Sequence, residues 1–399
     1  MAFGALRSLS AASPEELKLS PPLAATLGRW GLGLLLVGLG FSLVRPERLP
    51  GAVLLAALFA VSVGAGAAFF VALHWAVAAR WGVVVRRVVE ALAFSLTWTA
   101  PGLFLALLVV GPSLYPWLHH HETGFRGLWL SFPFFLGRAL VYLGLWVFFA
   151  RRLAVLSLQQ DQNPSLEKAA SLRKTAVAFL PVFAVTFSLA SFDWLMSLEP
   201  EFVSTIFGVY VFSGTFVAAL AGLTLLVTVL LHRGPRGVGP LASYVNPHHL
   251  HDLGKLLFAF ATFWAYIWFS QYMLIWYANL PEEASYFVKR LAGFWQPLFI
   301  LNLFLNWVLP FFALLPRASK RSPKALAWVS LVLLVGHALD FYLMVGPRAP
   351  WHALPSPVEV LLLAGAGFLV FAAAFAFLER VPVVPVGDPF LEASRHHRG

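Results

Sequence analysis

Long apolar stretches dominate this chain, and short polar segments between them hold most of the charged residues. A helix needs about 20 mainly apolar residues to cross the hydrocarbon core of a bilayer. Helices are favoured there because each one satisfies its own backbone hydrogen bonds without water. The pattern predicts ten membrane-spanning helices, at residues 25–44, 51–78, 88–111, 128–150, 174–191, 203–231, 254–279, 291–315, 325–346 and 357–378.

The ten stretches predict an all-α integral membrane protein with a transmembrane domain at 25–378, an N-terminal tail at 1–24 and a C-terminal tail at 379–399. We expect two four-helix bundles plus peripheral helices. One short match hints at duplication, because Ala-Phe-Ser-Leu-Thr-Trp at 93–98 resembles Ala-Phe-Ala-Thr-Phe-Trp at 259–264. Two parallel repeats of about four helices and a chance match between aromatic-rich helices both remain open interpretations.

Basic residues are distributed unequally between the two predicted sides of the membrane. An even number of spans puts both termini on one side, and the loops and tails there hold 21 Lys and Arg, against six on the other side. Cytoplasmic loops carry such an excess, so the count predicts that both termini are cytoplasmic. The formal net charge of +10 therefore reflects the excess of basic residues on the cytoplasmic side of the membrane. We predict no nucleic-acid partner.

Composition narrows the classes of protein further. The chain is 60% hydrophobic and 12% charged, whereas soluble domains have about 45–50% apolar and about 25% charged residues. A disordered chain and an ordinary water-soluble enzyme are thereby excluded. With no cysteine, the chain cannot ligate an iron–sulfur cluster, attach c-type haem or form a Cys zinc site. Histidines cluster at 119–121 and 248–251, but neither group has further ligands at convincing spacing, so we predict no metal site.

Three ionisable residues lie deep inside predicted spans, namely Arg138, His337 and Asp340. A charge at the bilayer centre costs about 2.5–3.5 kcal/mol on insertion scales, so each calls for a partner. At 1.5 Å per residue, all three lie about 20–24 Å from the cytoplasmic end of their spans. His337 and Asp340 share a helix face because they are three residues apart. We expect an Arg138–Asp340 ion pair, which either fixes helix packing alone or joins His337 in a proton relay.

Two further residues are candidates for the cytoplasmic half of such a relay. Glu90 stands four residues after Arg86, which predicts an interfacial salt bridge as the simpler interpretation. The alternative is a proton-loading carboxylate that forms an inner half-channel with His74.

On the outer side, Asp193 ends the fifth span beside Trp194, an interfacial aromatic residue. Asp193 is either a helix cap or a member of an outer half-channel with His337 and Asp340. Gln271 and Asn302 either form interhelical hydrogen bonds or line a wet cavity.

Several motifs resemble one family. They are Ser-Phe-Asp-Trp-Leu-Met-Ser-Leu-Glu-Pro at 191–200, Ser-Thr-Ile-Phe-Gly-Val-Tyr at 204–210, His-Asp-Leu-Gly-Lys at 251–255 and the aromatic-rich stretch at 263–278. They resemble the ActF-type membrane subunit of bacterial alternative complex III, a quinol:cytochrome c (electron acceptor) oxidoreductase. That subunit is itself similar to the NrfD-like membrane proteins of polysulfide reductases. The motif residues that carry over are Asp193, Asp252, Lys255 and Gln271.

The resemblance implies a respiratory complex in the bacterial inner membrane. Its other members are a multihaem cytochrome c subunit, an iron–sulfur subunit, a homologous ten-helix membrane subunit and other small membrane subunits, with a terminal oxidase as a further partner. Haem c and the iron–sulfur clusters belong to the partners, and quinol or quinone belongs to the complex as a whole. We therefore expect a quinone-related, proton-conducting subunit of the electron-transport chain, without cofactors or catalytic residues of its own. The alternative is a stand-alone secondary transporter, because deep charges and a repeat also suit that class.

Overall fold

The computed structural model describes residues 19, 23–119, 123–233, 238–347 and 354–398. This part of the chain is helical and contains no strand. Ten helical segments in it are long and apolar enough to cross a bilayer. The predicted all-α, multi-pass membrane protein is confirmed. Most of the N-terminal tail, together with Arg236, His120, His121 and Arg348, lies outside the described residues.

The first five spans occupy the N-terminal half of the chain. They are α2 (Ala24–Ser42), η3 with α3 (Pro46–Arg48 and Leu49–Ala76), α4 with α5 (Val83–Phe94 and Leu96–Leu114), α7 (Phe132–Gln162), and α8 with η5 (Leu166–Trp194 and Met196–Leu198). The predicted fourth span ends too early and the predicted fifth span starts too late, because helices α7 and α8 continue through polar residues.

The other five spans follow in the C-terminal half. They are α9 (Phe207–His232), α10 (Pro247–Ala278), α12 with the π-helical η7 and α13 (Trp295–Leu303, Phe304–Val308 and Leu309–Leu314), α15 (Pro323–Val345) and α16 (Pro357–Leu378). Short helices connect the spans or follow the last one, namely η4 (Pro116–Leu118), α6 (Gly124–Trp129), α11 (Pro281–Arg290), α14 (Arg317–Arg321) and α17 (Leu391–Arg395).

Eight of the spans form two rings of four helices with the same order of neighbours. In the first ring α3 packs on α5 and α8, and α7 packs on both α5 and α8. In the second ring α9 packs on α10 and α15, and the α12–α13 span packs on both α10 and α15. The remaining spans, α2 and α16, lie along each other outside the rings. This arrangement agrees with two four-helix bundles plus peripheral helices, and the matching segments 93–98 and 259–264 both lie in the second span of their ring.

The rings meet through their first helices. In the spans of α3 and α9, 83% of the most apolar stretch of 18 residues is buried inside the protein. The two helices approach closely at Gly66, where an added β-carbon would lie 2.7 Å from the Thr215 carbonyl oxygen and 2.8 Å from the Ala219 β-carbon. Small residues permit such contacts between membrane helices. Close packing of backbone on backbone therefore fixes one ring against the other.

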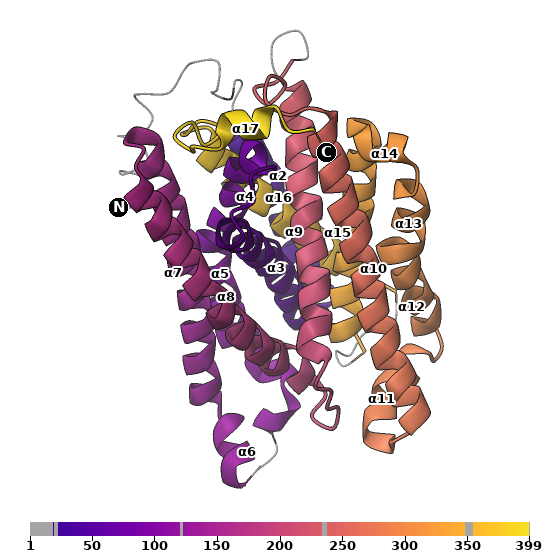
Figure 1. Cartoon of the computed structure of the whole chain (residues 1–399). Helices are drawn as coiled ribbons and strands as arrows, with labels where there is room; N and C mark the ends of the chain where they lie inside the picture. Colours follow the sequence, from indigo (N-terminus) through magenta and orange to yellow (C-terminus); the bar gives the residue numbers. More distant parts are fainter. Residues whose placement is uncertain (1–18, 20–22, 120–122, 234–237, 348–353, 399) are drawn as a thin grey trace.

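The two ends of the bundle differ in the segments they carry (Figure 1). At the upper end in Figure 1 lie α14 and α17, and at the lower end lie α6 and α11. We name the end with α14 and α17 the basic end, because its segments hold Arg80, Arg317 and Lys320. The opposite end, with Glu199 and the acidic first turn of α11, is the acidic end.

The close approach of α3 and α9 makes a stability prediction. Gly66→Leu should lower the melting temperature of the purified protein in detergent, because overpacking typically costs about 1–3 kcal/mol. The matched control is Gly102→Leu in α5, where nothing lies within 4 Å of an added β-carbon. Equal melting temperatures for the two variants would show that this contact does not hold the rings together.

Candidate functional site

Asp340 lies at the centre of the second ring, near the acidic end of α15, with 1% of its surface exposed. The other three helical spans of the ring each supply one donor. Tyr210 from α9 donates its hydroxyl to Oδ1, and Asn302 from α12 donates its amide to the same oxygen at 2.8 Å. Trp264 from α10 donates its indole N–H to Oδ2 at 3.1 Å. The carboxylate therefore joins all four spans of this ring.

Its donors are all neutral, which sets Asp340 apart from the other buried carboxylates. Among the described residues, every other buried Asp or Glu has an Arg or Lys nitrogen within 4 Å, namely Glu90, Asp193, Glu199, Asp252, Glu359 and Asp388. A buried charge without a counter-ion is costly, and uptake of a proton removes it. Asp340 is thus suited chemically to hold and release a proton.

His337 stands one turn before Asp340 on the same face of α15, as predicted. A β-carbon on Gly214 of α9 would lie 3.0 Å from His337 Nδ1 and 3.4 Å from Asp340 Oδ2. The other ring nitrogen, Nε2, is hydrogen-bonded with Ser62 of α3 at 3.0 Å. His337 Nδ1 has no hydrogen-bond partner among the described residues. The imidazole therefore connects the neighbourhood of Asp340 to the first helix of the other ring.

Arg138 does not pair with Asp340, so that prediction was wrong. It binds both carboxylate oxygens of Asp193, with Nε 2.9 Å from Oδ2 and a terminal nitrogen 2.8 Å from Oδ1. Because α7 extends to Gln162, Arg138 lies in its second turn, close to the acidic end, and Asp193 lies in the last turn of the neighbouring helix α8. Depth alone placed Arg138 and Asp340 in one layer, but they belong to different rings.

The negative charge of Asp193 is paired with Arg138, and neighbouring side chains donate further hydrogen bonds to its carboxylate. Besides Arg138, it accepts hydrogen bonds from Trp129 Nε1 at 3.0 Å and from the Tyr142 hydroxyl at 3.2 Å. The Arg138 guanidinium also stacks over the Trp129 ring, 4.0 Å from its centre. At the same end, burial and the negative charge of Asp193 raise the pKa of Tyr115 well above its usual value. These contacts link α7, α8 and Trp129, and they hold Asp193 in an ion pair, apart from His337 and Asp340 in the other ring.

Asp193 and Asp340 hold corresponding positions in the two rings. Each lies near the acidic end of the fourth helix of its ring and accepts a hydrogen bond from the third, from Arg138 in one and Asn302 in the other. The sequence contains a signal of this correspondence. Each aspartate stands seven residues before a proline (Pro200 and Pro347), and Arg138 and Asn302 each stand five residues after one. The second ring thus has an amide where the first has a cation.

A third cluster, which sequence reasoning missed, lies at the acidic end. Glu199 binds Arg290 at 2.8 Å and Lys289 at 2.9 Å. Arg290 also donates to the Leu343 carbonyl of α15 at 2.8 Å, while the Lys289 side chain is 46% exposed. The cluster therefore runs from the turn after Asp340 to the protein surface. In the sequence, Glu199 was only one of several acidic residues in outer loops.

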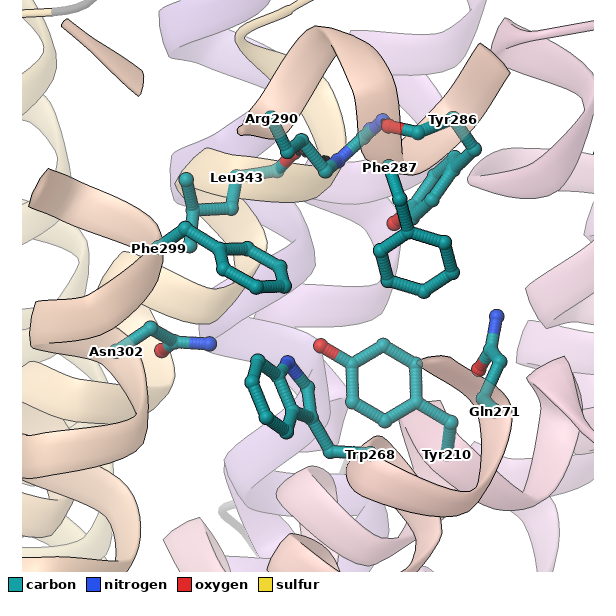
Figure 2. A pocket seen from close by; sticks show the side chains of 9 residues that line it. All are labelled: Tyr210, Trp268, Gln271, Tyr286, Phe287, Arg290, Phe299, Asn302 and Leu343. Carbon is teal, nitrogen blue, oxygen red and sulfur yellow. Dashed lines mark hydrogen bonds between the residues drawn. The ribbon is translucent and has the colours of Figure 1, made fainter. Parts of the chain in front are cut away.

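A narrow cavity lies between this cluster and Asp340 (Figure 2). Its polar walls are Tyr210, Gln271, Arg290 and Asn302, and aromatic rings complete it. It has room for about one water molecule. Both amide atoms of Gln271 are buried and have no hydrogen-bond partner among the described residues. Burial also raises the pKa of Tyr286 well above its usual value, so its phenol in the cavity wall stays neutral.

At the basic end, Glu90 pairs with Arg87 at 3.0 Å and not with Arg86 as expected. Arg87 also pairs with Asp161 of α7. Arg86 instead pairs with Asp388, because the C-terminal segment folds back over this end of the bundle. Adjacent arginines on α4 thus serve different carboxylates, and the partner of Arg86 lies 302 residues away in the sequence.

His74 is not hydrogen-bonded to Glu90 in the described structure. It is buried against Phe70 and Trp81, with ring centres 4.2 and 5.4 Å away. An added β-carbon on Gly82 would lie 2.3 Å from its Cε1 atom, so only glycine fits at that position. The inner half-channel predicted from His74 and Glu90 therefore lacks a direct link between the two side chains.

Residues 379–398, expected as a tail, act as a clasp over the basic end. Within this clasp, Ser394 donates to the Trp81 carbonyl of the first ring at 2.7 Å. On the second ring, Asp252 of α10 pairs with both His397 at 2.7 Å and Lys255 at 2.6 Å. The motif residues Asp252 and Lys255 thus belong to the clasp region, while Asp193 and Gln271 lie near the acidic end.

In the histidine cluster at 248–251, the described side chains take part in local structure at the start of α10. His249 completes the capping box at the start of α10 and contacts the Ser394 carbonyl at 2.9 Å. Among the described residues, no group of three or more His, Asp or Glu side chains is arranged to hold a metal ion.

Comparison with protein-family models finds none that matches the chain. A search of curated proteins likewise finds no significant match.

The contrast between the two aspartates predicts different effects of the same substitution. Asp193→Asn should sharply lower the melting temperature in detergent, because removing one partner of a buried ion pair typically costs about 3–5 kcal/mol. Asp340→Asn should lower it less, because it removes a buried charge and leaves no cation behind. The control is Glu201→Gln, at an exposed carboxylate of the acidic end. An Asp340→Asn protein that melts at or below the temperature of Asp193→Asn would contradict this account.

Proposed function

We propose that this chain is a membrane subunit of a bacterial respiratory quinol:cytochrome c (electron acceptor) oxidoreductase, and that its own task is to move protons. The observation that carries the proposal is Asp340, the buried carboxylate of the described structure that is held by neutral donors alone. The motifs shared with the ActF-type subunit of alternative complex III support the choice of complex. The basic end is the cytoplasmic end on the positive-inside rule.

In this proposal Asp340 is the central proton carrier. Its three neutral donors stay in place whether the carboxyl group is charged or protonated, because each can donate to an oxygen in either state. The Tyr210 hydroxyl can reverse its role and accept from the protonated acid. His337, three residues before Asp340 and in contact with Ser62, offers the connection toward the first ring. A proton relay needs such groups, which change charge or hydrogen-bond direction without moving the helices.

The cytoplasmic half of the route begins at Glu90. Its carboxylate is buried and paired with Arg87, and the clasp is fastened nearby on α4 through Arg86 and Asp388. His74 lies nearby as a buried imidazole without a direct bond to Glu90. Relay through this half therefore requires water between these groups or a movement of the clasp.

Electron transfer belongs to the partner subunits in this proposal. A multihaem cytochrome c subunit, an iron–sulfur subunit and a homologous ten-helix subunit would carry the electrons from quinol, with a terminal oxidase downstream. The acidic end, with Glu199, Glu282 and Glu283, would face the periplasmic partners. This chain would contribute the coupled movement of protons across the inner membrane.

The proton-carrier role is tested in the complex reconstituted into vesicles. Asp340→Asn should lower the number of protons moved per quinol oxidised, because an amide cannot release a proton at physiological pH. Assembly and haem content should stay unchanged, which separates this effect from misfolding. Glu201→Gln serves as the matched control. An unchanged proton stoichiometry in Asp340→Asn would refute the role of Asp340.

Purification tests the membership of a redox complex. Extraction of the membrane in mild detergent should yield this chain together with haem-bearing and iron–sulfur proteins, detected by visible absorption and mass spectrometry. A chain recovered alone or as a homo-oligomer would overturn the redox assignment and favour a stand-alone secondary transporter.

A further inference from the structure

We propose that the cavity beside Gln271 binds an ordered water molecule, and that this water is the exit through which a proton leaves Asp340 toward the acidic end. The direction of proton movement rests on the proposed function, whereas the water site rests on the geometry of the second ring alone.

The first argument is the unsatisfied amide of Gln271. This side chain lies about two turns from the acidic end of α10 and is 3% exposed. Neither its amide nitrogen nor its amide oxygen has a hydrogen-bond partner among the described residues. Burying an amide without partners typically costs about 1–3 kcal/mol on protein mutational data. A bound water that accepts from the nitrogen or donates to the oxygen removes that cost.

The second argument is the shape and lining of the space that Gln271 faces. The cavity has room for about one water molecule, which is too small for a quinone ring. Buried waters usually make about three hydrogen bonds, and polar groups in the wall can supply them (Figure 2). Tyr210, Asn302 and Arg290 line the same cavity as Gln271.

The third argument is continuity with Asp340. Two residues of the cavity wall, Tyr210 and Asn302, are also donors to the Asp340 carboxylate. Tyr210 therefore belongs both to the donors of Asp340 and to the wall of the cavity. When Asp340 is protonated, the hydroxyl oxygen accepts its proton and passes its own proton to the water. Asp340 becomes a carboxylate, Tyr210 is again a neutral phenol and the water becomes hydronium, so atoms and charge balance.

The fourth argument is continuity with the surface. Arg290 lines the cavity and pairs with Glu199, which also binds the half-exposed Lys289. The cavity is therefore separated from solvent at the acidic end by this ion cluster. Because Glu199 offsets one of the two positive charges, an excess proton in the cavity meets less repulsion than it would beside an isolated guanidinium.

Radiolytic footprinting of the purified protein tests the water site without any activity measurement. Hydroxyl radicals formed from a bound water modify the side chains beside it. Tyr210, Trp268 and Phe287 should be labelled despite their burial, whereas the fully buried Phe135 in the first ring should not be. Gln271→Met should lower this labelling by about tenfold, which corresponds to a loss of about 1.4 kcal/mol of water binding. The matched control is Gln296→Met, which replaces an exposed glutamine in the first turn of α12 and should not lower the labelling.

Proton stoichiometry in the reconstituted complex then tests the exit role. Both Gln271→Met and Asp340→Asn should lower the protons moved per quinol oxidised. The water site is overturned if Tyr210, Trp268 and Phe287 are not labelled in the wild-type protein. It is also overturned if their labelling persists in a folded Gln271→Met variant. A loss with Asp340→Asn but not with Gln271→Met overturns the exit and leaves the proposed function standing. If neither variant lowers the stoichiometry, the exit and the proposed function both fail.

Discussion

A charged carboxylate inside a lipid-embedded helical bundle is usually paired with a cation, because bulk water is absent and the loss of solvation of a lone charge is costly. That constraint organises this protein. Arginines hold most of the buried acids at both ends of the bundle, and three of these pairs join segments that are distant in the sequence. Arg86 with Asp388 fastens the clasp, Arg138 with Asp193 fastens two helices of the first ring, and Arg290 with Glu199 fastens α11. Asp340 is the departure from the rule, and the functional proposal follows from that departure.

The two rings place different partners around corresponding aspartates within one architecture. Corresponding aspartates lie near the acidic end of the fourth helix of each ring. In the first ring the facing residue on the third helix is Arg138, which binds both carboxylate oxygens and places a positive charge beside them. In the second ring it is Asn302, which donates one hydrogen bond and carries no charge. Replacement of a guanidinium by an amide changes the chemistry of the site while the packing of the ring is retained.

The ends of the bundle control access to this site in different ways. At the basic end, the clasp is fastened near Glu90 and ties both rings together through Trp81 and Asp252. At the acidic end, a small polar cavity and one ion cluster separate Asp340 from solvent. The barrier between Asp340 and the acidic end is therefore short, whereas the barrier at the basic end is made of folded polypeptide. The proposed proton path would have its short side toward the acidic end.

The sequence by itself determined the class of protein, the ten spans and the sharing of one helix face by His337 and Asp340, because these follow from local properties. Hydrophobic length sets a span, and the helical repeat sets a face. It also marked Arg138 as a charge inside a span that needs a partner, and it marked Glu90 and Asp193 as charged residues near the ends of their spans. Only the tertiary structure decided which partners they have, since residues at one depth in different helices are equivalent until the order of helices around each ring is known. The pairing of Arg138 with Asp193 could not be predicted for that reason. The pairing of Arg86 with Asp388 could not be predicted because nothing local in residues 379–398 reveals that this segment folds back onto α4.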